Sequence, residues 1–301
     1  MSELRVIGVE EAGFCFGVKR ALQLAHKATE SHHEVACLGP LIHNRQVVQE
    51  LERRGMRVVE GVSEVAPGSA ALIRAHGAEP RVYEEARERG VKLIDATCPF
   101  VRRAQQAAAR FAEDGYQVLV LGEREHPEAR AIVAHAGGRA TIVEKADELD
   151  DLEVEDRVAV VCQTTQRLAA LQELVTALLE RATELRVANT ICRATSQRQR
   201  ASVEIAREVD LMIVIGGYHS ANTNRLAEIC RGTGTPTEHI ETADELRSEW
   251  LEGVEVVGIT AGASTPPAAV EAVRDRLQEM AAERGDDTRS ADSGDDGGAG
   301  R

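Results

Sequence analysis

Residues 91–112 read VKLIDATCPFVRRAQQAAARFA, which is a strand pattern, a cysteine and a helical pattern in succession. The apolar run before Cys98 is typical of a buried strand, and the apolar spacing after it is typical of an amphipathic helix. The runs LRVIGV and LRVANTI precede Cys15 and Cys192, which are also followed by helical patterns. All three cysteines are therefore predicted to lie in strand-to-helix loops.

The three cysteines also divide the chain into repeated thirds. A glycine follows each cysteine by 24 residues, and a small polar side chain or histidine follows that glycine by four. The glycines are Gly39, Gly122 and Gly216, and the polar residues are His43, His126 and Ser220. Self-similarity of this kind indicates one structural unit used three times. We expect three small α/β domains, over residues 1–97, 98–191 and 192–285.

Strand and helix patterns alternate along the whole chain, which is typical of parallel sheets built from right-handed crossover units. The predicted strands are 4–9, 34–38, 56–59, 70–73, 92–95, 117–121, 140–143, 157–161, 186–188, 210–215, 236–239 and 255–259. The predicted helices are 18–30, 44–54, 80–89, 100–113, 166–182, 196–208, 222–232 and 266–283.

Composition limits the class of protein. The formal net charge of −14 argues against a nucleic-acid surface. No apolar run approaches the length of a membrane span, and the start MSELRVIGVEEAGF resembles neither a signal nor a transit peptide, so we expect a cytoplasmic enzyme that binds no membrane. Residues 286–301, rich in acids, glycine and serine, are predicted to form a disordered acidic tail.

Cys15, Cys98 and Cys192 are candidate metal ligands, because ligands collect beyond the carboxyl ends of parallel strands. A helix N-terminus is also expected to lower the pKa of a thiol there. The chain has no Cys-x-x-Cys pair of the kind that zinc favours, whereas an iron–sulfur cluster accepts distant thiolates, and three of them leave one iron open. Three unrelated structural cysteines remain the alternative.

The surroundings of these cysteines are apolar, since Phe14, Phe16 and Phe100 flank them and are expected to exclude water. The other cysteines, Cys37, Cys162 and Cys230, are expected to be core residues. A disulfide framework is disfavoured in a chain of this length and class.

Polar residues follow the other strands and suggest an anion site. Hydroxyls, amides, imidazoles and helix N-termini suit a diphosphate. These residues are His43, His76, His126, Thr164, Ser220, Asn222 and Ser264. Glu128 is the carboxylate beside a loop histidine, and it is either a buried proton donor with a raised pKa or a solvated residue at a helix start.

Some cofactors are disfavoured by the sequence. There is no G-x-x-x-x-G-K-[ST] loop and no dinucleotide fingerprint, so neither a nucleotide nor a flavin site is predicted. Electrons for redox chemistry would then have to come from a partner.

Nine motifs in order resemble the 4-hydroxy-3-methylbut-2-enyl diphosphate reductases, the LytB/IspH family of the methylerythritol phosphate route to isoprenoids. The motifs are GFCFGVKRA at 13–21, IHN at 42–44, AHG at 75–77, DATCP at 95–99, HPE at 126–128, QTT at 163–165, TICRAT at 190–195, NTNRL at 222–226 and TAGAS at 260–264. The resemblance runs from about residue 5 to 283.

The resemblance implies a trefoil of three α/β domains around a 4Fe–4S cluster held by Cys15, Cys98 and Cys192, whose fourth iron would bind the allylic hydroxyl of the substrate. Glu128 would relay a proton, and ferredoxin or flavodoxin would supply two electrons. The products would be isopentenyl and dimethylallyl diphosphate. The resemblance also implies the roles of the polar residues: His43, His76, Ser220, Asn222 and Ser264 would hold the diphosphate, and His126 and Thr164 would line the site.

The chain departs from the family pattern at one loop. Members usually carry Lys-Asn-Ser-Ser-Asn where this chain has Tyr218-His219-Ser220-Ala221-Asn222, so one hydroxyl is missing at Ala221 and weaker diphosphate binding is expected. Rival hypotheses are a paralogue with a shifted diphosphate substrate, a non-redox 4Fe–4S hydro-lyase, and an iron–sulfur redox sensor. The acidic body and the polar loops weigh against the sensor.

Overall fold

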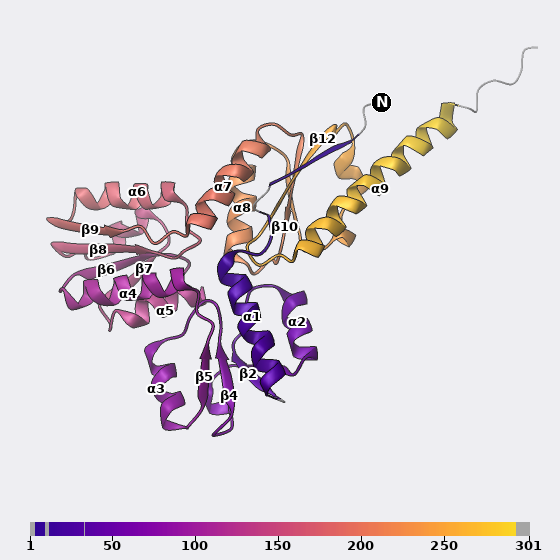
Figure 1. The fold of residues 1–301 in the computed structure, drawn as a ribbon. Coiled ribbons are helices and arrows are strands. Elements are labelled where there is room, and N and C mark those ends of the chain that lie inside the picture. The colour runs from indigo at the N-terminus through magenta and orange to yellow at the C-terminus, as the bar shows by residue number, and fades with distance from the viewer. Residues whose placement is uncertain (1–3, 10–11, 33, 293–301) are drawn as a thin grey trace, which may run out of the picture. The chain divides into compact units, whose positions relative to one another are not determined.

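The computed structural model describes residues 4–9, 12–32 and 34–292, and these form three four-stranded sheets (Figure 1). Every strand pair is parallel, which confirms the predicted class, α/β with parallel sheets. The chain divides into two compact units, residues 14–197 and the described part of residues 1–13 with 198–301. Each unit is described separately below.

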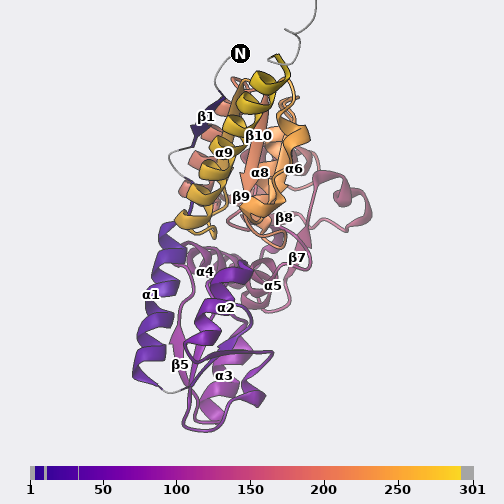
Figure 2. The same ribbon diagram turned by 90° about the vertical axis from the view of Figure 1, so that its right-hand side faces the viewer.

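The first sheet of unit 14–197 has the strand order β3-β2-β4-β5. Its strands are β2 (Val35–Leu38), β3 (Met56–Val59), β4 (Ala70–Ile73) and β5 (Lys92–Asp95). Helices α1 (Phe16–Ser31) and α2 (Arg45–Arg53) pack on one face and α3 (Pro80–Glu88) on the other (Figure 1), and Figure 2 looks onto the side of α1 and α2. β2 and β4 are buried on both faces, so they are continuous apolar runs, as parallel central strands are.

The second sheet of the same unit has the order β7-β6-β8-β9. Its strands are β6 (Gln117–Leu121), β7 (Ala140–Val143), β8 (Arg157–Cys162) and β9 (Glu184–Ala188). Helices α4 (Pro99–Glu113) and α5 (Pro127–His135) cover one face and α6 (Leu168–Leu179) covers the other (Figure 1). The predicted helices did not include α5, whose buried apolar residues, Ala129, Ala131 and Ile132, are mostly alanines and give no clear apolar stripe.

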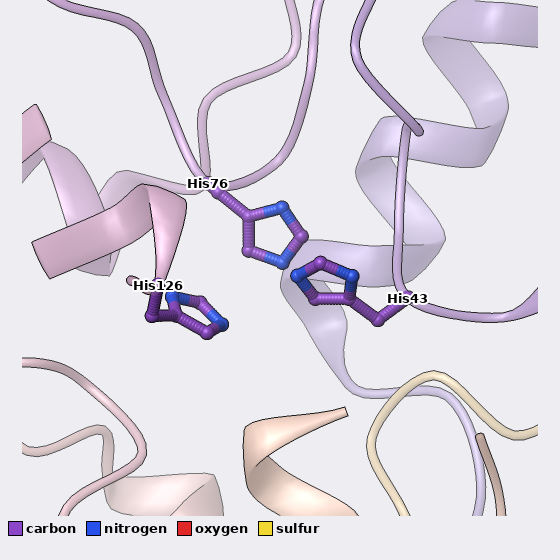
Figure 3. Close-up of side chains that lie close together, drawn as sticks. All are labelled: His43, His76 and His126. Atoms are coloured by element: carbon purple, nitrogen blue, oxygen red, sulfur yellow. The ribbon is translucent and has the colours of Figure 1, made fainter. Parts of the chain in front are cut away.

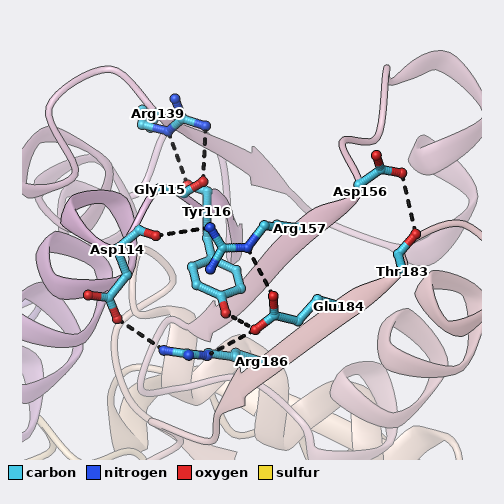
Figure 4. A network of polar contacts seen from close by, with 9 residues as sticks. All are labelled: Asp114, Gly115, Tyr116, Arg139, Asp156, Arg157, Thr183, Glu184 and Arg186. Carbon is cyan, nitrogen blue, oxygen red and sulfur yellow. Dashed lines mark hydrogen bonds and ion pairs between the residues drawn. The ribbon is translucent and has the colours of Figure 1, made fainter.

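The amino ends of the strands of this second sheet are tied by a polar network around Tyr116 (Figure 4). The guanidinium groups of Arg157 and Arg186 lie 4.2 and 4.6 Å from the Tyr116 ring centroid, and its hydroxyl donates to Glu184. Arg186 also pairs with Asp114 at 3.0 Å. The network links the edge strand β9 to the end of α4, at the opposite end of the sheet from the loops that follow the strands.

The other unit holds the third sheet, with the order β1-β12-β10-β11. Its strands are β1 (Arg5–Gly8), β10 (Leu211–Ile215), β11 (Thr237–Ile240) and β12 (Val256–Ala261). Helix α9 (Pro267–Asp292) packs on one face and α8 (Ala221–Arg231) on the other, beside the end of α7 (Arg193–Ala206).

Two predictions from the sequence disagree with the structure of this unit. Residues 5–8 were predicted to belong to the domain 1–97, but β1 pairs with β12, because the edge of β12 offers unpaired backbone groups in register with Arg5 to Gly8. The disordered tail was predicted to start at residue 286, but helix α9 continues to Asp292. Residues 293–301 lie outside the described residues. The domain boundaries at 98 and 192 stay a prediction. In the described part of the chain no helix is long and apolar enough to cross a membrane.

Candidate active site

The three predicted cysteine ligands lie together in unit 14–197. Cys15 is the N-cap of α1, Cys98 is the N-cap of α4, and Cys192 directly precedes α7. A side chain at Gly17 would place its Cβ 2.6 Å from the Cys98 sulfur and 3.9 Å from the Cys15 sulfur, so only glycine leaves room for both. Cys15 and Cys192 each act electrostatically on Cys98, as expected for three thiols that face one another.

The backbone fixes two of these cysteines. The Cys98 N–H donates to the Ala75 carbonyl at 2.9 Å, and the Cys192 N–H donates to the Thr164 carbonyl at 2.9 Å. Loops from neighbouring strands therefore hold the thiols in place. Among the described residues these thiols are free, and Cys37, Cys162 and Cys230 are buried in the cores, which confirms the prediction for them. Three convergent free thiols at helix N-termini fit a metal or an iron–sulfur cluster.

The prediction of a lowered thiol pKa is wrong for Cys98 and Cys192. Burial raises the pKa of Cys98 to about 11 and also raises the pKa of Cys192. Backbone N–H groups of Phe100 and Val101 act in the opposite direction on Cys98 but are the weaker influence. A metal ion bound at these thiols would favour their deprotonation through its positive charge.

The expected apolar wall around the cysteines is only partly present. Phe14 packs, together with Cys15, against the core of the first sheet. Phe16 is 64% exposed and Phe100 is 37% exposed, so neither ring is buried in the core as Phe14 is. Both residues stand in the first turn of a helix whose opposite side is buried, and their own positions face outward.

Three histidines come together near the loops that carry the cysteines (Figure 3). His43 follows β2, His76 follows β4, and His126 is the N-cap of α5. One ring nitrogen of each lies within 4.8 Å of the others, and the ring centroids of His43 and His76 are 4.3 Å apart. Glycine is favoured beside them, because Gly77 has a φ of +79° and a Cβ there would also clash with the Gln105 side-chain nitrogen.

Burial keeps two of these imidazoles neutral. It lowers the pKa of His126 to about 3 and the pKa of His76 well below its usual value, and the neighbouring histidines lower both further. The Nδ1 atom of His126 accepts the N–H of Glu128 at 3.1 Å, which leaves Nε2 as the protonated nitrogen of its neutral ring. Three close imidazoles of this kind suit either an anion, such as a phosphate, or a transition-metal cation.

Glu128 is a buried carboxylic acid rather than a solvated residue at a helix start. Its side chain is 2% exposed, and burial raises its pKa to about 7. Thr164 stabilises the ionised form, because its N–H and its hydroxyl donate to the two carboxylate oxygens at 2.6 and 3.0 Å. Burial outweighs these two hydrogen bonds, so Glu128 holds and releases a proton near neutral pH. Glu128 also acts electrostatically on Cys192.

Arg74 is a residue of this region that the sequence reasoning missed. It directly precedes the Ala-His-Gly motif, and a Cβ at Gly39 would lie 2.6 Å from its guanidinium. Burial lowers its pKa, and its charge acts on His76 and His126. No ion pair or hydrogen bond of its side chain is found among the described residues. The arginine directly before the Ala-His-Gly motif was the sequence signal that a positive charge would lie beside the histidines.

The remaining predicted residues lie in the other unit, at the carboxyl ends of β10 and β12. Ser220 is the N-cap of α8 and accepts the Thr223 N–H at 3.4 Å. Asn222 is 6% exposed, and its side-chain amide nitrogen has no hydrogen-bond partner among the described residues. Ser264 is also 6% exposed.

The loops after β10 and β12 are packed against each other. The Thr265 hydroxyl donates to the Ile215 carbonyl at 2.9 Å, and a Cβ at Gly216 would lie 2.8 Å from the Thr223 hydroxyl. The loops that carry Ser220, Asn222 and Ser264 are thus brought together at one end of the third sheet.

A family model described as LytB protein matches residues 6–278. The chain belongs to the LytB protein family. Curated LytB relatives cover nearly all of it. The chain is 46% identical over 274 residues, 91% of this chain and 97% of the relative, to the 4-hydroxy-3-methylbut-2-enyl diphosphate reductase of Geobacter sp. strain M21. It is 46% identical over 277 residues, 92% and 98% of the two chains, to the protein of that name from Geobacter sulfurreducens.

Solved structures agree with membership of the LytB family. The E-1-hydroxy-2-methyl-but-2-enyl-4-diphosphate reductase from Plasmodium falciparum matches with a TM-score of 0.86 and 26% identity, over 90% of this chain and 86% of that one. A structure of (E)-4-hydroxy-3-methyl-but-2-enyl diphosphate reductase, described as the terminal enzyme of the non-mevalonate pathway, matches with a TM-score of 0.65 and 40% identity. It covers 93% of this chain and all of that one.

Proposed function

We propose that this protein is a 4-hydroxy-3-methylbut-2-enyl diphosphate reductase. It removes the allylic hydroxyl of the substrate as water, with two electrons and two protons, and forms isopentenyl and dimethylallyl diphosphate. The observation that carries this proposal is the convergence of Cys15, Cys98 and Cys192 in the same unit as a buried carboxylic acid, Glu128, whose pKa is about 7. The names of the LytB relatives supply the carbon skeleton of the substrate.

The three cysteine thiolates would hold one 4Fe–4S cluster. When bound, such a cluster would pass electrons to the substrate and offer one iron that no cysteine occupies, which is suited to an oxygen ligand. Ferredoxin or flavodoxin would be the electron donor, and the cytoplasm is the compartment in which these thiols stay reduced.

The polar residues would bind the diphosphate end of the substrate. His43, His76 and His126 would donate hydrogen bonds from closely packed rings, and Arg74 would supply positive charge. Ser220, Asn222 and Ser264 would add hydroxyl and amide groups, with free backbone N–H groups at the start of α8. A diphosphate would also raise the pKa of the histidines and so favour their protonation.

Glu128 would supply a proton to the leaving hydroxyl. At pH 7 about half of these carboxyl groups carry the proton, which is the condition under which a group can both donate and be reloaded. Thr164 would orient the carboxyl through its two hydrogen bonds and line the site. Burial of this pair keeps bulk water from competing for the proton.

The proposal is tested by anaerobic turnover of the cluster-loaded protein with the allylic diphosphate and reduced methyl viologen, beside Cys98→Ser as a control. We expect both C5 diphosphates from the wild type only, and only with reductant. A dehydrated or hydrated diphosphate formed without reductant, in place of these two products, would indicate a hydro-lyase. No product from a protein with its full iron content would indicate a paralogue that uses another diphosphate.

A further inference from the structure

The helices that follow Cys15 and Cys98 share an uneven charge distribution. Each contains three lysine or arginine residues and a single acid, and that acid comes in the last two residues of the helix. The basic residues are Lys19, Arg20 and Lys27 in α1 and Arg102, Arg103 and Arg110 in α4. The whole chain has 50 acids against 36 lysines and arginines, so this bias departs from the average composition, and α7 after Cys192 shares it with three arginines against one glutamate.

Two basic residues lie near the start of each helix. One of them makes hydrogen bonds or an ion pair, and the other makes neither among the described residues. Arg20 donates to the Thr97 and Asp95 carbonyls at 3.1 and 3.4 Å, and Arg102 pairs with the Asp95 carboxylate at 2.7 Å. Lys19 and Arg103 are exposed, and their side chains have no hydrogen bond or ion pair among the described residues. Positive charge near a helix N-terminus is opposed by the helix dipole, so these two cations do not stabilise their own helices.

Exposed aromatic rings stand beside the free cations. Phe16 is 64% exposed and lies three residues before Lys19, and Phe100 is 37% exposed and lies three residues before Arg103. Residues three apart share a helix face, so each ring and its cation are exposed on the same side of their helix. The two helix starts are close, because Gly17 of α1 packs against the Cys98 sulfur. We call Phe16, Lys19, Phe100 and Arg103 the cysteine rim.

We propose that the cysteine rim is the docking surface for an acidic electron-carrier protein, which delivers electrons to the group held by the cysteines. This inference rests on the proposed function. Unpaired cations steer an acidic partner to the right place, and exposed aromatic rings supply the apolar centre of a small, transient interface. The rim residues follow Cys15 and Cys98 directly, in the first turns of the helices that these cysteines cap, so a carrier bound there is brought close to the electron acceptor.

The test compares Lys19→Glu/Arg103→Glu with Lys27→Glu/Arg110→Glu. Both double variants change the same charges on the same two exposed helix faces, but the control residues lie about 10–12 Å further along each helix. An acidic plant-type 2Fe–2S ferredoxin is the carrier. Its binding to the cluster-loaded proteins is measured by calorimetry, and turnover is measured with the ferredoxin and with reduced methyl viologen.

We expect the rim variant to bind ferredoxin at least about tenfold more weakly and to lose most of the salt dependence of the wild type, while the control changes by less than about twofold. The rate with methyl viologen should stay within about twofold in all three proteins. Equal losses with both reductants, equal effects of the two double variants, or wild-type binding that salt leaves unchanged would overturn the proposal. If the wild type reduced no allylic diphosphate with methyl viologen, the proposed function would fail, and the binding comparison would still decide on the docking surface.

Discussion

Glu128→Gln tests the physical state of the proposed proton donor. Burial raises the pKa of Glu128 from its ordinary value of 4.5 to about 7. Since each pKa unit is about 1.4 kcal/mol, ionisation of this carboxyl in the folded protein costs about 3 kcal/mol relative to the unfolded chain. The folded pKa lies above the unfolded one, so this part of the stability is fully present below pH 4.5 and is lost as the pH rises through 7.

Glutamine keeps the shape of the carboxyl and cannot ionise. Its side-chain oxygen can still accept the Thr164 N–H, which the carboxylate accepts at 2.6 Å. The free energy of unfolding of Glu128→Gln, minus that of the wild type, should therefore rise by about 3 kcal/mol between pH 4.5 and 8.5. Turnover should fall by about 10²–10⁴, because the proton donor is gone.

The assay is urea unfolding of both metal-free proteins at matched pH values, followed by circular dichroism. Thr164→Val, which removes the 3.0 Å hydroxyl bond to the carboxylate, is the companion variant and should raise the pKa of Glu128 further. A stability difference between Glu128→Gln and wild type that stays constant across this pH range would refute the reasoning, since it would mean that Glu128 titrates alike in the folded and unfolded chains.

Other predictions concern the diphosphate. Arg74→Gln should weaken pyrophosphate binding at least about tenfold in calorimetry, because a charge-assisted contact is lost, and unchanged affinity would remove Arg74 from the site. Pyrophosphate binding at pH 7 should take up protons and strengthen as the pH falls, because burial keeps His76 and His126 neutral until an anion arrives; equal heats in buffers of different ionisation enthalpy would contradict this. Ala221→Ser, at a buried position in the first turn of α8, should lower the KM for the allylic diphosphate about fivefold, and an unchanged KM would show that the missing hydroxyl has no effect.

The strands were predictable from the sequence because central parallel strands are buried on both faces. β4 and β10, for example, are unbroken apolar runs that end at small polar loops. The partner of β1 was not predictable, because Arg5 to Gly8 carries no signal for which sheet edge it joins. Helix α5 was missed because its buried apolar residues are mainly alanines, Ala129 and Ala131, which give a weak periodic signal.

The site was predictable in its chemistry and less so in its electrostatics. Equal spacing in three repeats indicated that Cys15, Cys98 and Cys192 are related, and the fold brings them together. The sequence did not reveal that burial would outweigh the helix N-terminus for the Cys98 thiol, since desolvation depends on packing from distant segments. The sequence left Glu128 as either a buried proton donor or a solvated residue at a helix start. Burial in the fold raises its pKa to about 7, which decides for the proton donor.

The central claim is that this chain reduces its substrate rather than rearranging or hydrating it. The most direct measurement is the number of methyl viologen radicals oxidised per molecule of C5 diphosphate formed, in an anaerobic reaction with limiting allylic diphosphate. The account predicts two radicals oxidised for each isopentenyl or dimethylallyl diphosphate. C5 product formed with no viologen oxidation, or viologen oxidation without loss of the hydroxyl, would contradict it.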